Sequence, residues 1–106
     1  MEFQEHIQHA MRVREQYAQL EERQYGRAWT SEEIALGFVG DVGDLAKLVQ
    51  AQNGVRNIPD AENKIAHELA DCLWSTIVLA KMFGIDLERA FVQTMSELEK
   101  DIAARL

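Results

Sequence analysis

The stretch that decides the fold reads LADCLWSTIVLAKMF and runs from Leu69 to Phe83. Its apolar residues fall on almost every side of a helix drawn through it, and they do not alternate with polar residues as in a half-buried strand. A helix that is apolar nearly all round is buried on more than one side. We therefore expect one side to pack within the chain and the other against a second subunit. The alternative is a central helix wrapped only by its own neighbours.

Outward from this helix, apolar residues at helical spacing predict two helices on its N-terminal side. The first covers about residues 2–25 and ends at Gly26. The second begins at Thr30, because Glu33 three residues later completes a capping box, and it ends at Asn53-Gly54. No long window alternates with period two, so strands are not expected.

The central helix itself begins near Asp60 and ends before Gly84, and Asp86 is the N-cap of a fourth helix. So short a joint predicts that the third and fourth helices pack antiparallel. We expect an all-α fold, a four-helix bundle forming a single domain over residues 1–106. Oligomerisation would complete the bundle, as a homodimer or a homotetramer.

Composition narrows the classes of function. Eighteen acidic and eleven basic residues give a net charge of −7, which repels nucleic-acid phosphates and argues against nucleic-acid binding. A divalent cation could still bridge an acidic protein to a phosphorylated small molecule. The single Cys72 cannot form an internal disulfide, and the sequence contains neither a membrane-spanning apolar run nor a signal peptide. We expect a cytoplasmic protein that does not contact membranes.

Two pairs of carboxylates interrupt the apolar helices. Asp41 and Asp44 lie on the second helix, and Glu68 and Asp71 on the third. Residues three apart share one face of a helix, so antiparallel packing would bring all four carboxylates to one partly buried point. Oxygen ligands select hard cations such as Mg²⁺ or Mn²⁺. The alternative is that both pairs are solvated charges on an amphipathic face.

A di-iron site of the ferritin type is not expected. Such a site needs Glu-x-x-His on two helices, and neither acidic pair supplies it. His67 directly precedes Glu68 and therefore points about 100° away from it around the helix.

Three segments resemble the MazG-like all-α nucleotide pyrophosphatases, whose motif is Glu-Glu-x-x-Glu on one helix and Glu-x-x-Asp on the next. The segments are FVGDVGDLA at residues 38–46, ELAD at 68–71 and LAKMFGIDLE at 79–88. The resemblance covers about Trp29 to Lys100. In this sequence Gly40 replaces the first Glu of the motif, and the shorter Asp occupies the other two positions.

The resemblance implies metal-dependent hydrolysis of the α–β phosphoanhydride of a nucleoside triphosphate, which releases a monophosphate and pyrophosphate. It implies that Asp41, Asp44, Glu68 and Asp71 are the catalytic metal ligands, in a dimer or tetramer with the site near a subunit interface. The cellular role would be the clearance of unwanted nucleotides. Because of Gly40, the alternative is a MazG-like helical module that dimerises or binds a nucleotide without catalysis.

Further residues are candidates for substrate contacts. Lys64, one turn before Glu68, and Lys81 are candidates for the triphosphate, although an ordinary surface charge is the preferred interpretation of each. Trp29 could stack on a base, but we expect it in the core. Gly37, Gly40 and Gly43 recur every three residues, and each costs about 1 kcal/mol of helix propensity. We hypothesise that they let a helix or a phosphate approach the backbone.

Overall fold

The computed structural model describes residues 2–106, which form four α-helices and no strand. The helices are α1 (Phe3–Tyr25), α2 (Ser31–Gln52), α3 (Ala61–Met82) and α4 (Leu87–Arg105). The prediction of an all-α fold is confirmed. Within residues 2–106, no helix is both long enough and apolar enough to cross a lipid bilayer.

The helices begin and end where local sequence signals place them. Gly26 ends α1 in the left-handed conformation, at φ 82°, and its N–H donates to the Glu22 carbonyl. At the start of α2 the Thr30 hydroxyl accepts from the Glu33 N–H, and the Glu33 carboxylate accepts from the Thr30 N–H. The predicted capping box is thus confirmed. Gly84 is left-handed after α3, at φ 68°.

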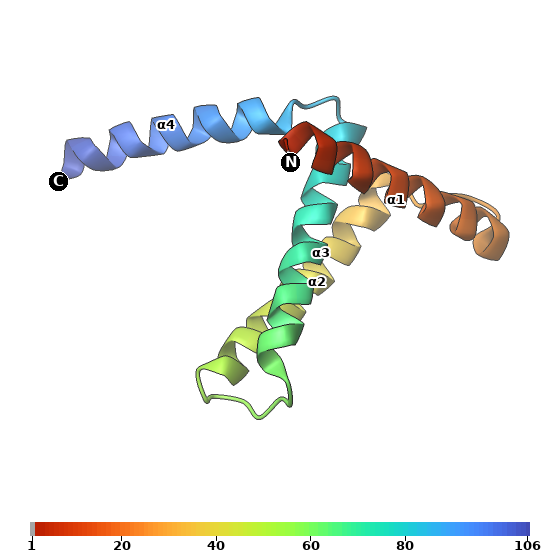
Figure 1. Cartoon of the computed structure of the whole chain (residues 1–106), viewed down its shortest axis with the longest axis horizontal. Coiled ribbons are helices and arrows are strands. Elements are labelled where there is room, and N and C mark those ends of the chain that lie inside the picture. Colours follow the sequence, from red (N-terminus) through yellow and green to blue (C-terminus); the bar gives the residue numbers. More distant parts are fainter. Residues whose placement is uncertain (1) are drawn as a thin grey trace.

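The core of the chain is an antiparallel hairpin of α2 and α3, joined by residues 53–60 (Figure 1). α1 crosses this hairpin near the C-terminal part of α3. Trp74 of α3 contacts α1 at this crossing. Its Nε1 donates to the Ala10 carbonyl at 3.1 Å, and its ring centroid lies 5.7 Å from that of Tyr17. The buried apolar side chains come from these three helices and are Ile7, Ile34, Leu48, Ala61, Ile77, Val78 and Ala80.

The expected antiparallel packing of the third and fourth helices is wrong. α4 leaves the end of α3 at a wide angle and projects away from the hairpin (Figure 1). The short joint, with the left-handed Gly84, sets where each helix stops, but it does not by itself turn the chain back along α3. No residue along the whole of α4 is buried. A single chain therefore does not close a four-helix bundle.

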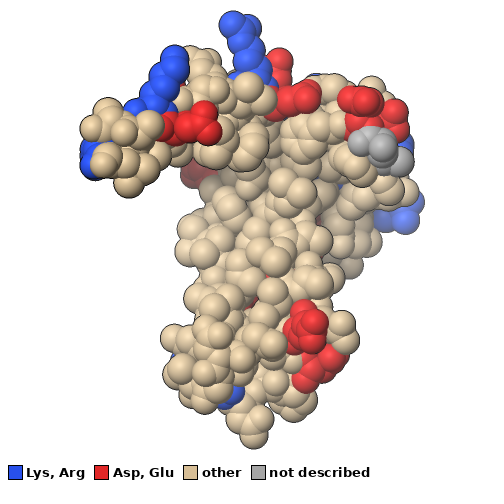
Figure 2. Space-filling model, turned by 60° about the vertical axis from the view of Figure 1, so that its left-hand side comes forward, with Lys and Arg blue, Asp and Glu red and all other residues tan. Residues whose placement is uncertain are grey.

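Large apolar surfaces remain open on the chain. α3 is not wrapped by its own neighbours, since Leu69 and Leu73 are each 53% exposed. The radius of gyration is 16.9 Å, against about 13 Å for a compact domain of this length. The accessible surface is 8094 Å², about 2,000 Å² more than a compact monomer of this mass exposes. Figure 2 shows a broad surface along the hairpin with almost no charged side chains.

An ion pair between Arg27 and Glu33 joins the end of α1 to the start of α2. Hydrogen bonds from Arg27 and from the Thr30 N–H lower the pKa of Glu33 to about 2. A carboxyl group whose pKa is lower in the folded state stabilises that state above its unfolded pKa of about 4.5, and the contribution is lost as the pH falls toward 2.

Replacing Glu33 with Gln tests this ion pair, because Gln retains the capping geometry and removes the charge. We expect Glu33→Gln to have a lower Tm than the parent protein at pH 7. The difference should shrink as the pH falls from about 4.5 to about 2, because the parent then loses the same charge. Thermal unfolding followed by circular dichroism at several pH values measures it. A difference that does not depend on pH would contradict the expectation.

Candidate metal centre

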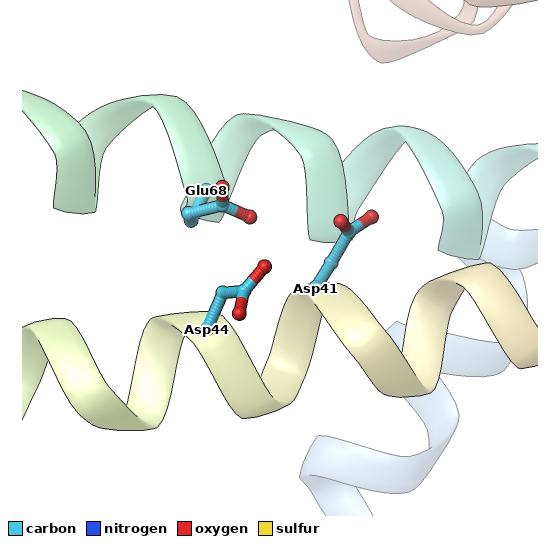
Figure 3. Close-up of side chains that lie close together, drawn as sticks. All are labelled: Asp41, Asp44 and Glu68. Atoms are coloured by element: carbon cyan, nitrogen blue, oxygen red, sulfur yellow. The ribbon is translucent and has the colours of Figure 1, made fainter.

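Three of the four predicted carboxylates converge between α2 and α3. Asp41 and Asp44 lie one turn apart on α2 and face Glu68 across the hairpin (Figure 3). Each offers one oxygen, and these oxygens all lie within 4.8 Å of one another. The i, i+3 spacing thus places both aspartates on the face that meets α3, as predicted.

One carboxylate oxygen of the cluster is left unpaired among residues 2–106. The Oε2 atom of Glu68 is buried and has no hydrogen-bond partner among residues 2–106. Burial raises the pKa of Glu68, and the neighbouring charges of Asp41, Asp71 and Asp44 raise it further. The pKa of Asp41 is raised for the same reasons, first by burial and then by Asp71 and Asp44. A buried carboxylate oxygen without a partner, in an all-oxygen donor set, fits a hard divalent cation.

Asp71 lies beside the three converging carboxylates rather than among them. Its Oδ2 pairs with the Nε2 of His67 at 3.1 Å, one turn earlier on α3. Asp71 nevertheless contributes to the raised pKa of both Asp41 and Glu68, so its charge acts on the cluster. Considered only in relation to Glu68, from which it points away, His67 gave no prediction of its contact with Asp71. Its i, i+4 spacing from Asp71 is the signal that could have revealed it.

A cavity of about 440 Å³ opens on one side of the carboxylates. Lys47 and Lys64 line it together with Asp44 and Glu68. Lys81 lies elsewhere, in a separate cavity formed with residues at the N-terminus and around the α3–α4 joint. The structure therefore brings Lys64 to the cluster, but not Lys81.

A larger cavity of about 590 Å³ opens on the other side of the cluster, under α1. Asp41 and Asp71 lie at its wall, and Trp29 lines it with the aromatic side chains of Tyr17 and Trp74. The expectation that Trp29 fills the core is wrong, since the residue is 39% exposed. The carboxylates thus separate a cavity containing lysines from a cavity with aromatic walls.

The repeated glycines of α2 are not approached closely by another helix among residues 2–106, while the predicted approach of a phosphate stays a prediction. A Cβ atom built at Gly40 or Gly43 would meet no atom within 4 Å among the described residues. At Gly37 it would lie 3.8 Å from the Trp29 ring, which is ordinary van der Waals contact. Among residues 2–106, no helix therefore needs these glycines in order to pack.

The comparisons with known proteins agree with this geometry. Residues 29–100 match the family model of the MazG nucleotide pyrophosphohydrolase domain, which is more than half of the chain. The chain belongs to the MazG nucleotide pyrophosphohydrolase family. No curated protein and no solved structure matches it. The MazG match contains all of α2 and α3 with the four carboxylates, whereas α1 lies outside it.

Proposed function

We propose that this MazG-family protein is a metal-dependent nucleoside triphosphate pyrophosphohydrolase. It would cleave a ribo- or deoxynucleoside triphosphate at the α–β phosphoanhydride, giving a monophosphate and pyrophosphate, and so clear unwanted nucleotides. The observation that carries the proposal is that Asp41, Asp44 and Glu68 each offer one oxygen within 4.8 Å of the others, and that the buried Oε2 of Glu68 has no hydrogen-bond partner in the described part of the chain.

The proposed ligands are Asp41, Asp44 and Glu68, with Asp71 as the fourth. The cation is Mg²⁺, with Mn²⁺ as a substitute, and when bound it supplies Lewis-acid charge to the phosphates and to the attacking water. Asp71 lies one turn from Glu68 on the same face of α3, and His67 holds its side chain beside the cluster. The four carboxylates together fix where the scissile phosphoanhydride would lie.

The two cavities suggest how the substrate is oriented. Lys47 and Lys64 would meet the negative charge of the β- and γ-phosphates in the cavity that contains them. The base and sugar would enter the opposite cavity, where Trp29 and the neighbouring aromatic rings offer flat apolar surfaces for stacking. The α–β bond would then lie beside the carboxylates that separate the two cavities.

We also propose that the active species is a homodimer or a homotetramer. The excess surface of about 2,000 Å² per chain is of the size that obligate partners bury. Phe91, Met95, Leu98 and Ile102 recur at intervals of four, three and four residues along α4, which is the spacing of a coiled-coil seam. All four side chains are exposed in the single chain. The proposed partner of this seam is a second copy of the chain, because that copy carries the same apolar seam.

A second candidate function is a nucleotide-binding or dimerisation module without catalysis. It is favoured by Gly40, which stands where the MazG motif has its first Glu and so removes one possible ligand. Both candidates require the carboxylates to bind a cation, but only the first requires turnover.

Assays of pyrophosphate release separate the two candidates. The purified protein is incubated with the four ribo- and four deoxynucleoside triphosphates, dUTP and oxidised purine triphosphates, with and without Mg²⁺. The proposed function predicts release with at least one nucleotide that stops on chelation and is lost in Asp71→Asn. Thermal stabilisation by Mn²⁺ without any turnover would favour the module instead. Neither stabilisation nor turnover would overturn both candidates.

A further inference from the structure

A buried ion pair on α1 lies outside the part of the chain that matches MazG. Arg14 and Glu21 are each 8% exposed, and the Nη1 of Arg14 donates to both carboxylate oxygens of Glu21, at 3.1 and 3.2 Å. Seven residues span two helical turns, so both side chains leave the same face of α1. Burying such a pair costs desolvation, and replacing it with apolar residues is often neutral or stabilising. Stability alone therefore does not explain the pair.

Both members of the pair hold the backbone of Trp29. The Trp29 N–H donates to the Oε1 of Glu21 at 2.7 Å, and the Nη2 of Arg14 donates to the Trp29 carbonyl oxygen at 3.1 Å. The two polar groups of one residue in the α1–α2 connection are thus fixed by two side chains. The next residue, Thr30, is the N-cap of α2, so the connection is also anchored at its far end.

The residue held in this way lines the aromatic cavity next to Asp41 and Asp71. The residue is 39% exposed, so its surroundings enclose it only in part. Tyr17 and Trp74 form the facing part of the same wall and are already fixed by the α1–α3 crossing. The Arg14–Glu21 pair therefore holds the backbone of Trp29, the aromatic residue of this wall that lies in the α1–α2 connection rather than in a helix.

We propose that Arg14 and Glu21 are positioning residues for base recognition. They hold Trp29 at the place where it stacks on the base of the nucleotide. This inference rests on the proposed function and adds that base selectivity depends on α1. Loss of the pair should weaken contacts made to the base and leave those made to the phosphates and the cation unchanged.

The test uses the double variant Arg14→Met/Glu21→Leu, which fills the same space without charge, and the single variant Arg14→Lys. Lys retains the charge but lacks the planar fork that reaches both Glu21 and the Trp29 carbonyl. Arg12→Lys, at an exposed position on the same helix, is the matched control. Circular dichroism confirms that each variant is folded. The readouts are KM and kcat for the best nucleotide, the Mn²⁺ dissociation constant, and inhibition by inorganic tripolyphosphate, which has no base.

We expect the double variant and Arg14→Lys to raise KM roughly tenfold with kcat nearly unchanged. This pattern indicates the loss of an interaction that contributes equally to binding the substrate and the transition state. Inhibition by tripolyphosphate and Mn²⁺ affinity should match the parent protein. Folded variants with the parent KM would overturn the inference and leave the proposed function intact. Equal losses for nucleotide and tripolyphosphate would also overturn it. A parent protein that neither binds nor cleaves any nucleotide would overturn the proposed function, and this inference with it.

Discussion

Replacing Glu68 with Gln is expected to lower kcat/KM for pyrophosphate release at least a hundredfold. The substitution keeps the shape of the side chain and removes the charge of one of the two proposed ligands on α3. Metal ions contribute several kcal/mol to transition-state stabilisation, and each 1.36 kcal/mol corresponds to a factor of ten. Steady-state assays over a range of Mg²⁺ concentrations measure the loss.

The same variant should gain stability when no metal is present. Burial and three neighbouring carboxylates raise the pKa of Glu68, so its ionised form is disfavoured in the folded protein. A carboxyl group with a raised pKa weakens the folded state as the pH rises through that pKa, so at pH 7 a neutral Gln removes this cost. We expect Glu68→Gln to have a higher Tm in chelator and no further gain with Mn²⁺.

Glu62→Gln is the matched control, because Glu62 lies on an exposed part of the first turn of α3. It should keep the parent activity and the parent response to Mn²⁺. Turnover by Glu68→Gln at the parent rate would refute the proposed site. A lower metal-free Tm in that variant would show that Glu68 has a stabilising partner in solution.

Replacing Leu98 with Lys is expected to dissociate the assembly and to lower the Tm. Leu98 is 54% exposed in the single chain, where such a change would alter stability by no more than about 0.5 kcal/mol. At an apolar seam between copies, truncating a buried Leu alone costs about 2–5 kcal/mol, and an unpaired charge adds to that. Sedimentation equilibrium and thermal unfolding at several protein concentrations separate the two cases.

Lys100→Glu, two residues further along α4, is the control for a change of charge on the same helix. It should keep the mass of the parent assembly. A parent protein that sediments at 12.1 kDa over the micromolar range would contradict the expected oligomer. If Leu98→Lys forms an assembly of the same mass as the parent protein, the contact between copies does not involve this face of α4.

Sequence patterns predicted those parts of the fold that depend on neighbouring residues. The capping box of Thr30 and Glu33, the stop at Gly26 and the acidic pair of Asp41 and Asp44 all act within one helical turn. Asp60 was expected at the start of α3 and is its N-cap, in a left-handed conformation that Asp tolerates better than most residues. These features need no knowledge of the rest of the chain.

The remaining features depend on contacts that spacing does not encode. The direction of α4 could not be predicted, because its apolar face finds no partner within the chain. Arg14 and Glu21 share a helical face in the sequence, but their bonds to Trp29 cross a turn and depend on where α1 lies. Asp71 has the spacing of a ligand and also the i, i+4 spacing of a partner for His67, so spacing alone does not decide between the two.

The carboxylates come from both arms of the hairpin, and residues 53–60 join those arms. A cation held between Asp44 and Glu68 would therefore close a ring through that connection and tie the arms together without a covalent bond. A ligand that binds only the native state stabilises that state. If the cation is the proposed Mg²⁺, magnesium scarcity would therefore lower the stability of the protein together with its proposed activity.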